Sequence, residues 1–425
     1  MLQLLAFTHN WGAHANPNLT VRFTGNRIEQ MKHLILKKGE DRRIRLGHLW
    51  IFSNEVDTKK SPLKEFEPGE SAVVVNAQGR PIGSAYVNPN SLICARMISN
   101  RPHEGLTEAL LDRRISQALT LRESMFDKPF YRMVFAEGDF LPGLVIDRYD
   151  DLLVAQLTTA GMEKMKDQIT SVLCDILHPK AILFRNDSAN RPLEGLDRYV
   201  EQAVGTVPAK ICLEENGVKF EVPMIEGQKT GWFYDQRTNR RDFASFCNGK
   251  RVLDAFCYAG SFGCNAVKAG AKEVTFLDAS KIALDAAVHN ASLNGSPDKV
   301  DTVYGDALDT LQELKDSGAQ FDVICVDPPA FIKRKKAFKE GLSAYQRVNK
   351  LAMDLVVDGG IVTSCSCSQH LSAQDLNRVL LHAASKSKTR IQTLIQGHQG
   401  PDHPVHPAMP ETHYLKSYTV RVFKS

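Results

Sequence analysis

The second half of the chain alternates between short apolar runs and longer segments in which apolar residues recur at helical spacing. The short runs predict buried strands, and the longer segments predict helices. Because strands that alternate with helices form mostly parallel sheets covered on both faces, residues 206–425 are predicted to be a doubly wound α/β domain. The predicted strands are Arg251–Phe256, Glu273–Asp278, Asp301–Asp306, Phe321–Asp327, Gly360–Cys365, Ile391–Ile395 and Tyr418–Phe423.

Residues 31–103 have a different pattern, in which short β-branched runs are separated by turn residues. This spacing favours a small β-rich, barrel-like domain. A basic and aromatic segment containing Arg42, Arg43 and Trp50 lies between the first predicted strands. Such a mixture suits RNA, because arginines contact phosphates and rings stack on bases. It equally fits a packed aromatic corner with a solvated basic face.

Residues 104–205 combine both patterns and are predicted to form an α+β middle domain. Helices are expected at residues 106–126 and Ala160–Leu177, and strands at Leu152–Leu157 and Ala181–Arg185. After this region, Asn216-Gly217 separates two alternating runs. That dipeptide is typical of a type I′ hairpin, in which both central residues need positive φ.

The first 30 residues fit no folded element. Their apolar start is too short for the core of a signal peptide, and no basic segment precedes it. We expect either a disordered extension or translation from an upstream start, with Met31 as the native first residue.

Composition narrows the choice of partners and compartment. The net charge of +4 permits nucleic-acid binding but does not require it. The nine cysteines include no pair of CxxC motifs, which argues against a structural zinc site and favours free thiols in the cytoplasm. No apolar run approaches the ~20 residues of a membrane helix, so no membrane contact is expected.

Acidic residues end several predicted strands of the α/β domain. Asp254, Asp278 and Asp306 end the first three, and a glycine-containing turn follows the first. Carboxyl ends of parallel strands gather at the ligand-binding edge of the sheet. Acids there repel a pyrophosphate but tolerate the cationic sulfonium of S-adenosylmethionine, so this methyl donor is predicted rather than a dinucleotide. Each carboxylate also fits a simple helix cap.

Further cofactor contacts are predicted on both sides of the first strand. The turn after Asp254 supplies one group, and a mixed aromatic and polar segment before the sheet supplies another that could close over the cofactor. The same upstream segment also fits a helix start with an exposed basic face. The predicted contacts are Phe256, Tyr258, Gly260, Phe233, Asp235, Gln236 and Arg237.

The predicted reacting residues are Cys367 and Asp327, which follow two neighbouring strand ends. Cys367 lies further along than Cys365 and is therefore expected to be the more exposed thiol at the ligand edge. A thiolate that adds to C6 of a cytosine makes C5 nucleophilic enough to attack a sulfonium methyl group. Asp327 could hold the N3/N4 edge of the ring. The base must be unpaired or flipped out, which suits single-stranded RNA.

A basic loop follows Asp327 directly. Its residues Lys333, Arg334 and Lys335 could grip RNA phosphates, and Phe331 could stack on the target base. A solvated loop anchored by Phe331 is the alternative.

At these residues the chain resembles the bacterial 23S ribosomal RNA cytosine-C5 methyltransferase I family, a class I S-adenosylmethionine-dependent group. The resemblance runs from about Met31 to the C-terminus. It implies a PUA-like first domain, a seven-stranded sheet with an antiparallel last strand, a 23S ribosomal RNA substrate, and possible homodimers. The segments that carry it include His48–Ser53, Gly138–Arg148, Lys229–Arg237, Asp402–Val405 and Tyr414-Leu415-Lys416.

The family's nucleophile is the cysteine of a Ser-Cys-Ser segment, which here is Ser366-Cys367-Ser368. Two departures stand out. Ala330 replaces the lysine that commonly follows the two prolines, and the second cysteine of other RNA cytosine-C5 methyltransferases is absent at that place. The residue that removes the C5 proton is therefore unassigned. Two other functions stay open: methylation of an exocyclic amine, and a non-enzymatic role in ribosome assembly.

Overall fold

The computed structural model describes residues 31–224, 231–295 and 300–424. The two alternatives for residues 1–30 therefore lie outside the described residues. The described residues from Lys32 onward form a single compact unit, in which two five-stranded sheets, a two-stranded hairpin and a seven-stranded sheet follow one another along the chain. Within the described ranges, no helix has the length and apolar character needed to cross a bilayer.

The first sheet confirms the β-rich prediction for the N-terminal region. Its five strands lie in the order β1-β3-β4-β5-β2, with β1 parallel to β3 and the other pairs antiparallel. The chain enters it through short apolar runs that bury their side chains in one cluster around Leu34, Val74 and Ala85. Its elements are β1 (Lys32–Ile35), α1 (Asp41–Arg45), β2 (Trp50–Ile51), β3 (Glu70–Val75), β4 (Pro81–Val87) and β5 (Ala95–Ser99).

The second sheet and its helices form the predicted α+β region. Its strand order is β10-β9-β8-β7-β6, and only β8 and β9 are parallel. The single helix predicted at Ala160–Leu177 is divided at Met165, and Gly161 of the first part lies against the ring of Tyr86. The elements are α2 (Glu108–Met125), β6 (Phe130–Phe135), β7 (Leu144–Tyr149), β8 (Leu152–Leu157), α3 (Ala160–Lys164), α4 (Lys166–Leu177), β9 (Ala181–Asn186) and β10 (Tyr199–Val204).

A hairpin, β11 (Lys210–Glu215) and β12 (Val218–Pro223), follows, and Asn216 and Gly217 at its tip have the positive φ expected for this turn. The third sheet then has seven strands in the order β15-β14-β13-β16-β17-β19-β18. Its last strand, β19, runs antiparallel to both neighbours, as the family resemblance implied. The strands are β13 (Arg251–Ala255), β14 (Glu273–Asp278), β15 (Val300–Tyr304), β16 (Phe321–Val326), β17 (Val356–Ser366), β18 (Thr389–Gly397) and β19 (Lys416–Lys424).

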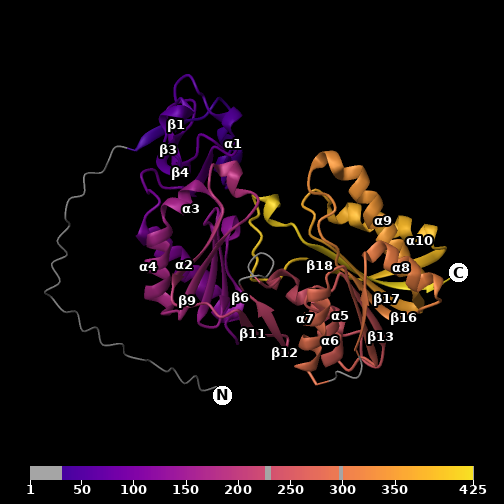
Figure 1. The fold of residues 1–425 in the computed structure, drawn as a ribbon. Helices are drawn as coiled ribbons and strands as arrows, with labels where there is room; N and C mark the ends of the chain where they lie inside the picture. The colour runs from indigo at the N-terminus through magenta and orange to yellow at the C-terminus, as the bar shows by residue number, and fades with distance from the viewer. Residues whose placement is uncertain (1–30, 225–230, 296–299, 425) are drawn as a thin grey trace, which may run out of the picture. The chain divides into compact units, whose positions relative to one another are not determined.

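Helices cover both faces of the seven-stranded sheet, because its strands are apolar on both sides. One face packs on Phe243, Phe262 and Ala287, from α5 to α7. The other packs on Leu311, Val348 and others from α8 to α10, which Figure 1 shows grouped together. The helices are α5 (Arg237–Ala244), α6 (Ser261–Lys268), α7 (Lys281–Ser292), α8 (Ala307–Asp316), α9 (Phe338–Leu355) and α10 (Ala373–Lys386).

The loop between β18 and β19 returns to the second sheet and is fixed there by a buried arginine. Arg122 of α2 is 0% exposed and forms two hydrogen bonds with Asp139, at 2.6 and 2.7 Å. The same guanidinium donates to the backbone oxygen of Asp402 at 2.7 Å. Asp402 in turn accepts the backbone N–H of Arg132 at 3.0 Å. These bonds hold the loop that leads into the candidate site.

Candidate active site

The carboxyl ends of β13, β14 and β16 meet where the turn after β13 adopts an unusual backbone. Phe256, Tyr258 and Gly260 all have positive φ, at 63°, 50° and 75°. Non-glycine residues rarely adopt this conformation, and such strain concentrates at ligand sites. The turn is held in place by the next strand: the N–H of Tyr258 donates to Asp278 Oδ2 at 3.0 Å. The predicted cofactor turn is therefore a fixed structure at the expected edge of the sheet.

Asp278 and Asp306 both accept backbone N–H groups. Asp278 Oδ1 accepts from Ser280 at 2.9 Å, and Asp306 Oδ1 caps α8 by accepting from Leu308 at 2.9 Å and Asp309 at 3.4 Å. The capping interpretation therefore holds for Asp306. Both carboxylates can still accept hydrogen bonds from a ligand, because each oxygen can accept more than one hydrogen bond.

Asp254 is 1% exposed and sits under the turn. Its Oδ2 accepts the N–H of Gly263 at 2.7 Å, while its Oδ1 is buried with no hydrogen-bond donor among the described residues. Burial raises the pKa of Asp254 to about 7, and the bond from Gly263 only partly offsets this while the charge of Asp327 adds to it. A buried carboxylate oxygen without a donor is expected where a ligand completes the site.

The two glycines of the turn, Gly260 and Gly263, are tightly packed around their α-carbons, and a cofactor contact of Gly260 stays a prediction. A Cβ on Gly263 would lie 2.1 Å from the Phe276 ring, and one on Gly260 would lie 2.8 Å from Ala287 Cβ. The space that the missing side chains leave is thus filled by β14 and α7. Close seating of α6 on the sheet is what requires glycine here.

In the segment before α5, some side chains contact the turn after β13, and others contact residues elsewhere in the protein. The ring of Phe233 packs edge-on against Tyr258, with centroids 5.5 Å apart. Asp235 accepts the hydroxyl hydrogen of Tyr414. Gln236 accepts from Asn239 at 2.6 Å, within the same helix start.

The guanidinium of Arg237 lies 4.2 Å from the Phe126 ring centroid and donates to the backbone oxygen of Phe130. These contacts join α5 to the second sheet. A cofactor contact of Gln236 or Arg237 stays a prediction.

Cys365 and Cys367 have different surroundings although they are two residues apart. Strand β17 ends at Ser366, so Cys365 is still in the strand, fully buried, with its thiol 3.4 Å from Ser417 Oγ. Cys367 follows the strand end and is partly exposed. The thiol expected to be more exposed is thus the one that leaves the sheet.

A cavity of about 290 Å³ opens at Cys367, and its walls come from all three sheet regions. Trp50 comes from the first region. Phe135, the last residue of β6, and the two residues after it come from the second region, and the rest flank β17 and β19 in the third. The lining residues are Trp50, Phe135, Ala136, Glu137, Cys367, Gln369, Glu411, Thr412 and Tyr414. We call this the Cys367 pocket. Sequence reasoning placed Trp50 on an RNA-binding surface and assigned no role to Glu137 or Glu411.

Hydroxyl groups fix the backbone on either side of Cys367. Tyr345 OH accepts from Ser366 Oγ at 2.8 Å and lies 2.9 Å from Ser368 Oγ. Ser368 Oγ also accepts the N–H of Ile332 at 3.1 Å. The thiol therefore projects from a rigid turn that is braced by α9 and by the loop after Asp327.

Asp327 follows β16, the strand next to β17, and its charge acts on Asp254. Phe331, four residues later, packs on Tyr345 with ring centroids 4.8 Å apart. Lys333, Arg334 and Lys335 are exposed. The structure thus brings Phe331 beside the Cys367 turn and leaves the three cations open to solvent.

The two arginines predicted to bind RNA differ from each other. Arg42 is exposed on α1. Arg43 is largely committed to the fold: it pairs with Glu55 at 2.7 Å, donates to the Trp50 oxygen at 3.2 Å and lies over the Phe52 ring. For Arg43 the packed-corner alternative therefore describes its contacts.

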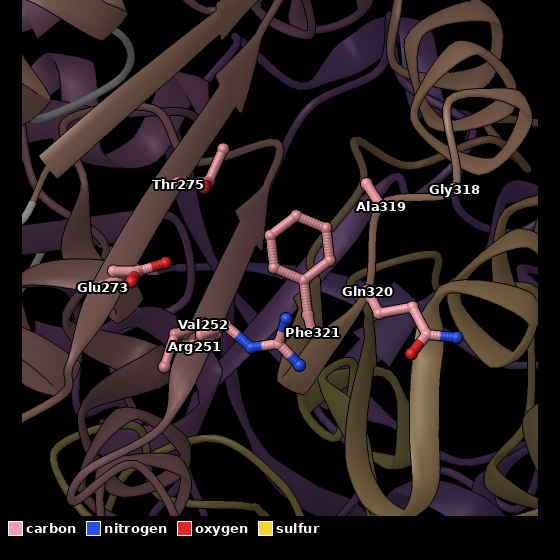
Figure 2. Close-up of a pocket in the computed structure, with 8 residues that line it drawn as sticks. All are labelled: Arg251, Val252, Glu273, Thr275, Gly318, Ala319, Gln320 and Phe321. Atoms are coloured by element: carbon pink, nitrogen blue, oxygen red, sulfur yellow. The ribbon is translucent and has the colours of Figure 1, made fainter.

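A second cavity, of about 360 Å³, lies at the opposite edge of the seven-stranded sheet. Figure 2 shows its lining residues, which include Arg251, Glu273 and Phe321 at the amino ends of β13, β14 and β16. Ligands of open α/β sheets bind at the carboxyl ends of the strands, so this cavity is not the candidate site. In residues 31–224, 231–295 and 300–424, no cluster of three or more His, Cys, Asp or Glu could hold a metal ion.

Comparisons with known proteins agree with this geometry. A family model described as a PUA-like domain matches residues 34–100, and one described as an S-adenosylmethionine-dependent methyltransferase matches residues 192–408. A solved structure of a methyltransferase complexed with SAH has a TM-score of 0.80 at 18% identity, covering 92% of this chain and 100% of that one. This likeness shows a shared fold.

Curated relatives narrow the family further. The chain is 37% identical over 393 residues to Ribosomal RNA large subunit methyltransferase I of Shewanella denitrificans, which covers 91% of this chain and 98% of the relative. The protein of the same name from Shewanella frigidimarina is 36% identical over the same shares. S-adenosylmethionine is therefore the cofactor. The chain belongs to the ribosomal RNA large subunit methyltransferase I family.

Proposed function

We propose that this protein methylates C5 of a cytosine in large-subunit (23S) ribosomal RNA, through a covalent bond between Cys367 and C6 of the base. The observation that carries the proposal is the position of Cys367, a partly exposed thiol that lines a pocket and follows the carboxyl end of β17 in a methyltransferase sheet. The names of the relatives supply the class of RNA.

The residues at the sheet edge fit S-adenosylmethionine. When bound, this cofactor supplies an electrophilic methyl group. Asp278, at the end of β14, can accept the ribose hydroxyls, and the fixed turn at Phe256–Gly260 provides the wall beside it. Asp254 Oδ1 is a buried acceptor that has no donor among the described residues. The ring of Phe233 packs on Tyr258, beside the same turn.

The proposed chemistry gives Cys367 and Asp327 separate tasks. The thiolate of Cys367 adds to C6, and the electrons of the C5=C6 bond make C5 nucleophilic while N3 takes up a proton. C5 then forms a bond to the methyl carbon as the carbon–sulfur bond of the sulfonium breaks. Loss of the C5 proton restores the C5=C6 bond as the electron pair of the C6–S bond returns to Cys367, and N3 releases the proton that it took up. Asp327 is proposed to hold the N3 side of the ring.

Glu411 supports cytosine rather than uracil as the target. Glu411 lines the Cys367 pocket, and its Oε2 is buried with no hydrogen-bond donor among the described residues. The nearest cation candidate, His48 Nε2, is 4.0 Å away, and burial followed by the charge of Arg43 lowers the pKa of His48. A carboxylate of this kind can accept from the exocyclic amine of cytosine, whereas uracil presents an acceptor there.

Four exposed cations could contact an RNA backbone. Lys333, Arg334 and Lys335 lie in the loop after Asp327, and Arg42 lies in the first region with Trp50. We propose that they contact phosphates while Trp50 and Phe331 contact the target base or its neighbours. A ribosomal substrate agrees with a cytoplasmic location, and a homodimer stays a prediction.

The deciding experiment compares Cys367→Ala with Cys365→Ala. Bisulfite sequencing of 23S ribosomal RNA from a strain lacking the gene and complemented with each variant reports methylated cytosines directly. We expect no methylation with Cys367→Ala and retained methylation with Cys365→Ala, provided that both variants bind S-adenosylmethionine in calorimetry. Full methyl transfer by Cys367→Ala would exclude the covalent route and favour methylation of an exocyclic amine.

A further inference from the structure

Lys416 is a buried lysine beside the reacting thiol. It is the first residue of β19 and pairs with Ser366, the residue immediately before Cys367. Lys416 is 5% exposed. A lysine is almost never buried to this extent unless its charge has a specific partner.

The ammonium group of Lys416 forms hydrogen bonds with the backbone next to Cys367. Lys416 Nζ donates to the backbone oxygen of Ser368 at 2.6 Å and to that of Tyr414 at 2.7 Å. Ser368 is the residue after Cys367, and Tyr414 lines the Cys367 pocket. Among the ion pairs of the described residues, none includes Lys416. The hydrogen-bond partners of Lys416 are therefore neutral carbonyl groups, one directly after Cys367 and one in the segment before β19.

The charge balance of the pocket explains why a cation is needed there. Glu137 and Glu411 line the pocket, and Asp235 accepts from Tyr414 behind it. Burial raises the pKa of Tyr345 and Tyr414, so both phenols stay neutral. Burial, then His398 and Lys416, lower the pKa of His413, so it adds no charge at neutral pH. Burial also lowers the pKa of Lys416 to about 8, and an ionised Cys367 acts in the opposite direction.

We propose that Lys416 is a positioning residue that stabilises the thiolate of Cys367 through its charge. The inference rests on the proposed function, in which this sulfur is the nucleophile. The thiol proton passes to solvent through the pocket, and the ammonium of Lys416 stays protonated. After the sulfur–C6 bond breaks, the returning electron pair on sulfur again faces the same cation. Without Lys416 the thiolate would face the carboxylates of the pocket uncompensated.

The test measures how fast iodoacetamide alkylates Cys367 as a function of pH, by mass spectrometry of the peptide that contains it. Lys416→Met removes the charge, Lys416→Gln keeps a hydrogen-bond donor without the charge, and Lys416→Arg keeps the charge. We expect both neutral variants to react about tenfold more slowly at pH 7, with the reaction curve displaced to higher pH by about one unit. Lys416→Arg should react close to the wild-type rate.

Cys212 is exposed and lies far along the chain from this turn, so its alkylation in the same digest is the internal control. Identical curves for wild type and the neutral variants would overturn the inference, as would equal slowing in Lys416→Arg, which would show a packing role. The outcome is separate from that of Cys367→Ala: the alkylation curve tests the charge at the thiol, and RNA methylation tests whether the thiol reacts with the base.

Discussion

The indole nitrogen of Trp50 donates a hydrogen bond to Glu137 Oε1 at 2.7 Å, and both residues line the Cys367 pocket. One comes from the first sheet region and the other follows β6 of the second. The bond therefore joins two regions at the wall of a pocket whose thiol belongs to a third. The N-terminal region thus contributes directly to the pocket in which the base is proposed to react.

Trp50→Phe should weaken RNA methylation without weakening cofactor binding. The substitution keeps a ring but removes the donor to Glu137, at a cost of about 1 kcal/mol in stability. We expect kcat/KM for RNA to fall while calorimetry gives an unchanged Kd for S-adenosylmethionine. Leu46→Ala, on an exposed side chain of the same region, is the control. A parallel loss of cofactor affinity would contradict this division of labour.

Glu411→Gln should reduce the preference for cytosine. The amide can donate to O4 of uracil, whereas the carboxylate can only accept from the cytosine amine. A contact of this kind discriminates by about 1–3 kcal/mol, which is roughly fivefold to 150-fold in the ratio of cytosine to uracil turnover. Methyl transfer to matched RNA oligonucleotides measures this ratio. Glu340→Gln, an exposed glutamate near the start of α9, should leave it unchanged, and an unaltered ratio in Glu411→Gln would refute the assignment.

Asp254→Asn should stabilise the cofactor-free protein in a pH-dependent way. Burial raises the folded-state pKa of Asp254 from 3.8 to about 7, so the folded protein binds this proton more tightly than the unfolded chain. Protonated Asp254 makes its whole contribution to the stability of the wild type below pH 4, and this contribution is lost as the pH rises to 7. The loss is at most ~4 kcal/mol.

Thermal unfolding of the two proteins therefore diverges between pH 5 and pH 8, with the larger gain for Asp254→Asn at pH 8. Cofactor affinity should fall, because Oδ1 is the proposed acceptor. Asp301→Asn, at an exposed aspartate of β15, provides the comparison. A gain of equal size at both pH values would show that ionisation of Asp254 is not its cause.

Gly263→Ala should destabilise the fold although Gly263 is not in a strained conformation. A Cβ at this position would lie 2.1 Å from the Phe276 ring, so α6 has to shift from the sheet. Overpacking of this kind costs about 1–3 kcal/mol. At Gly105 the nearest atom to an added Cβ is 3.5 Å away, so Gly105→Ala should unfold at the wild-type midpoint. Equal midpoints for the two variants in urea unfolding would contradict the packing argument.

The sequence predicts the seven-stranded sheet and its ligand edge well because both depend on local patterns. The apolar runs that end in Asp254 and Asp278 show where each strand stops. Parallel pairing then places these strand ends at the same edge of the sheet. The packing role of Gly260 and Gly263 was not predictable, because the sequence does not reveal that Phe276 and Ala287 fill the space beside them. Glu411 has no local pattern that distinguishes it from any exposed glutamate. Its buried oxygen appears only when the loop before β19 meets the first two regions.

The Cys367 pocket also has a consequence for how the protein acquires activity. Trp50 and Tyr414 meet across almost the whole described chain, whereas the cofactor edge from Asp254 to Asp306 is built from nearby segments. Contacts between distant segments form late in folding, because long loops must close first. During refolding, we expect a stage in which the protein already binds the methyl donor but the pocket around the Cys367 sulfur has not yet formed. Catalytic competence is therefore the last property to return.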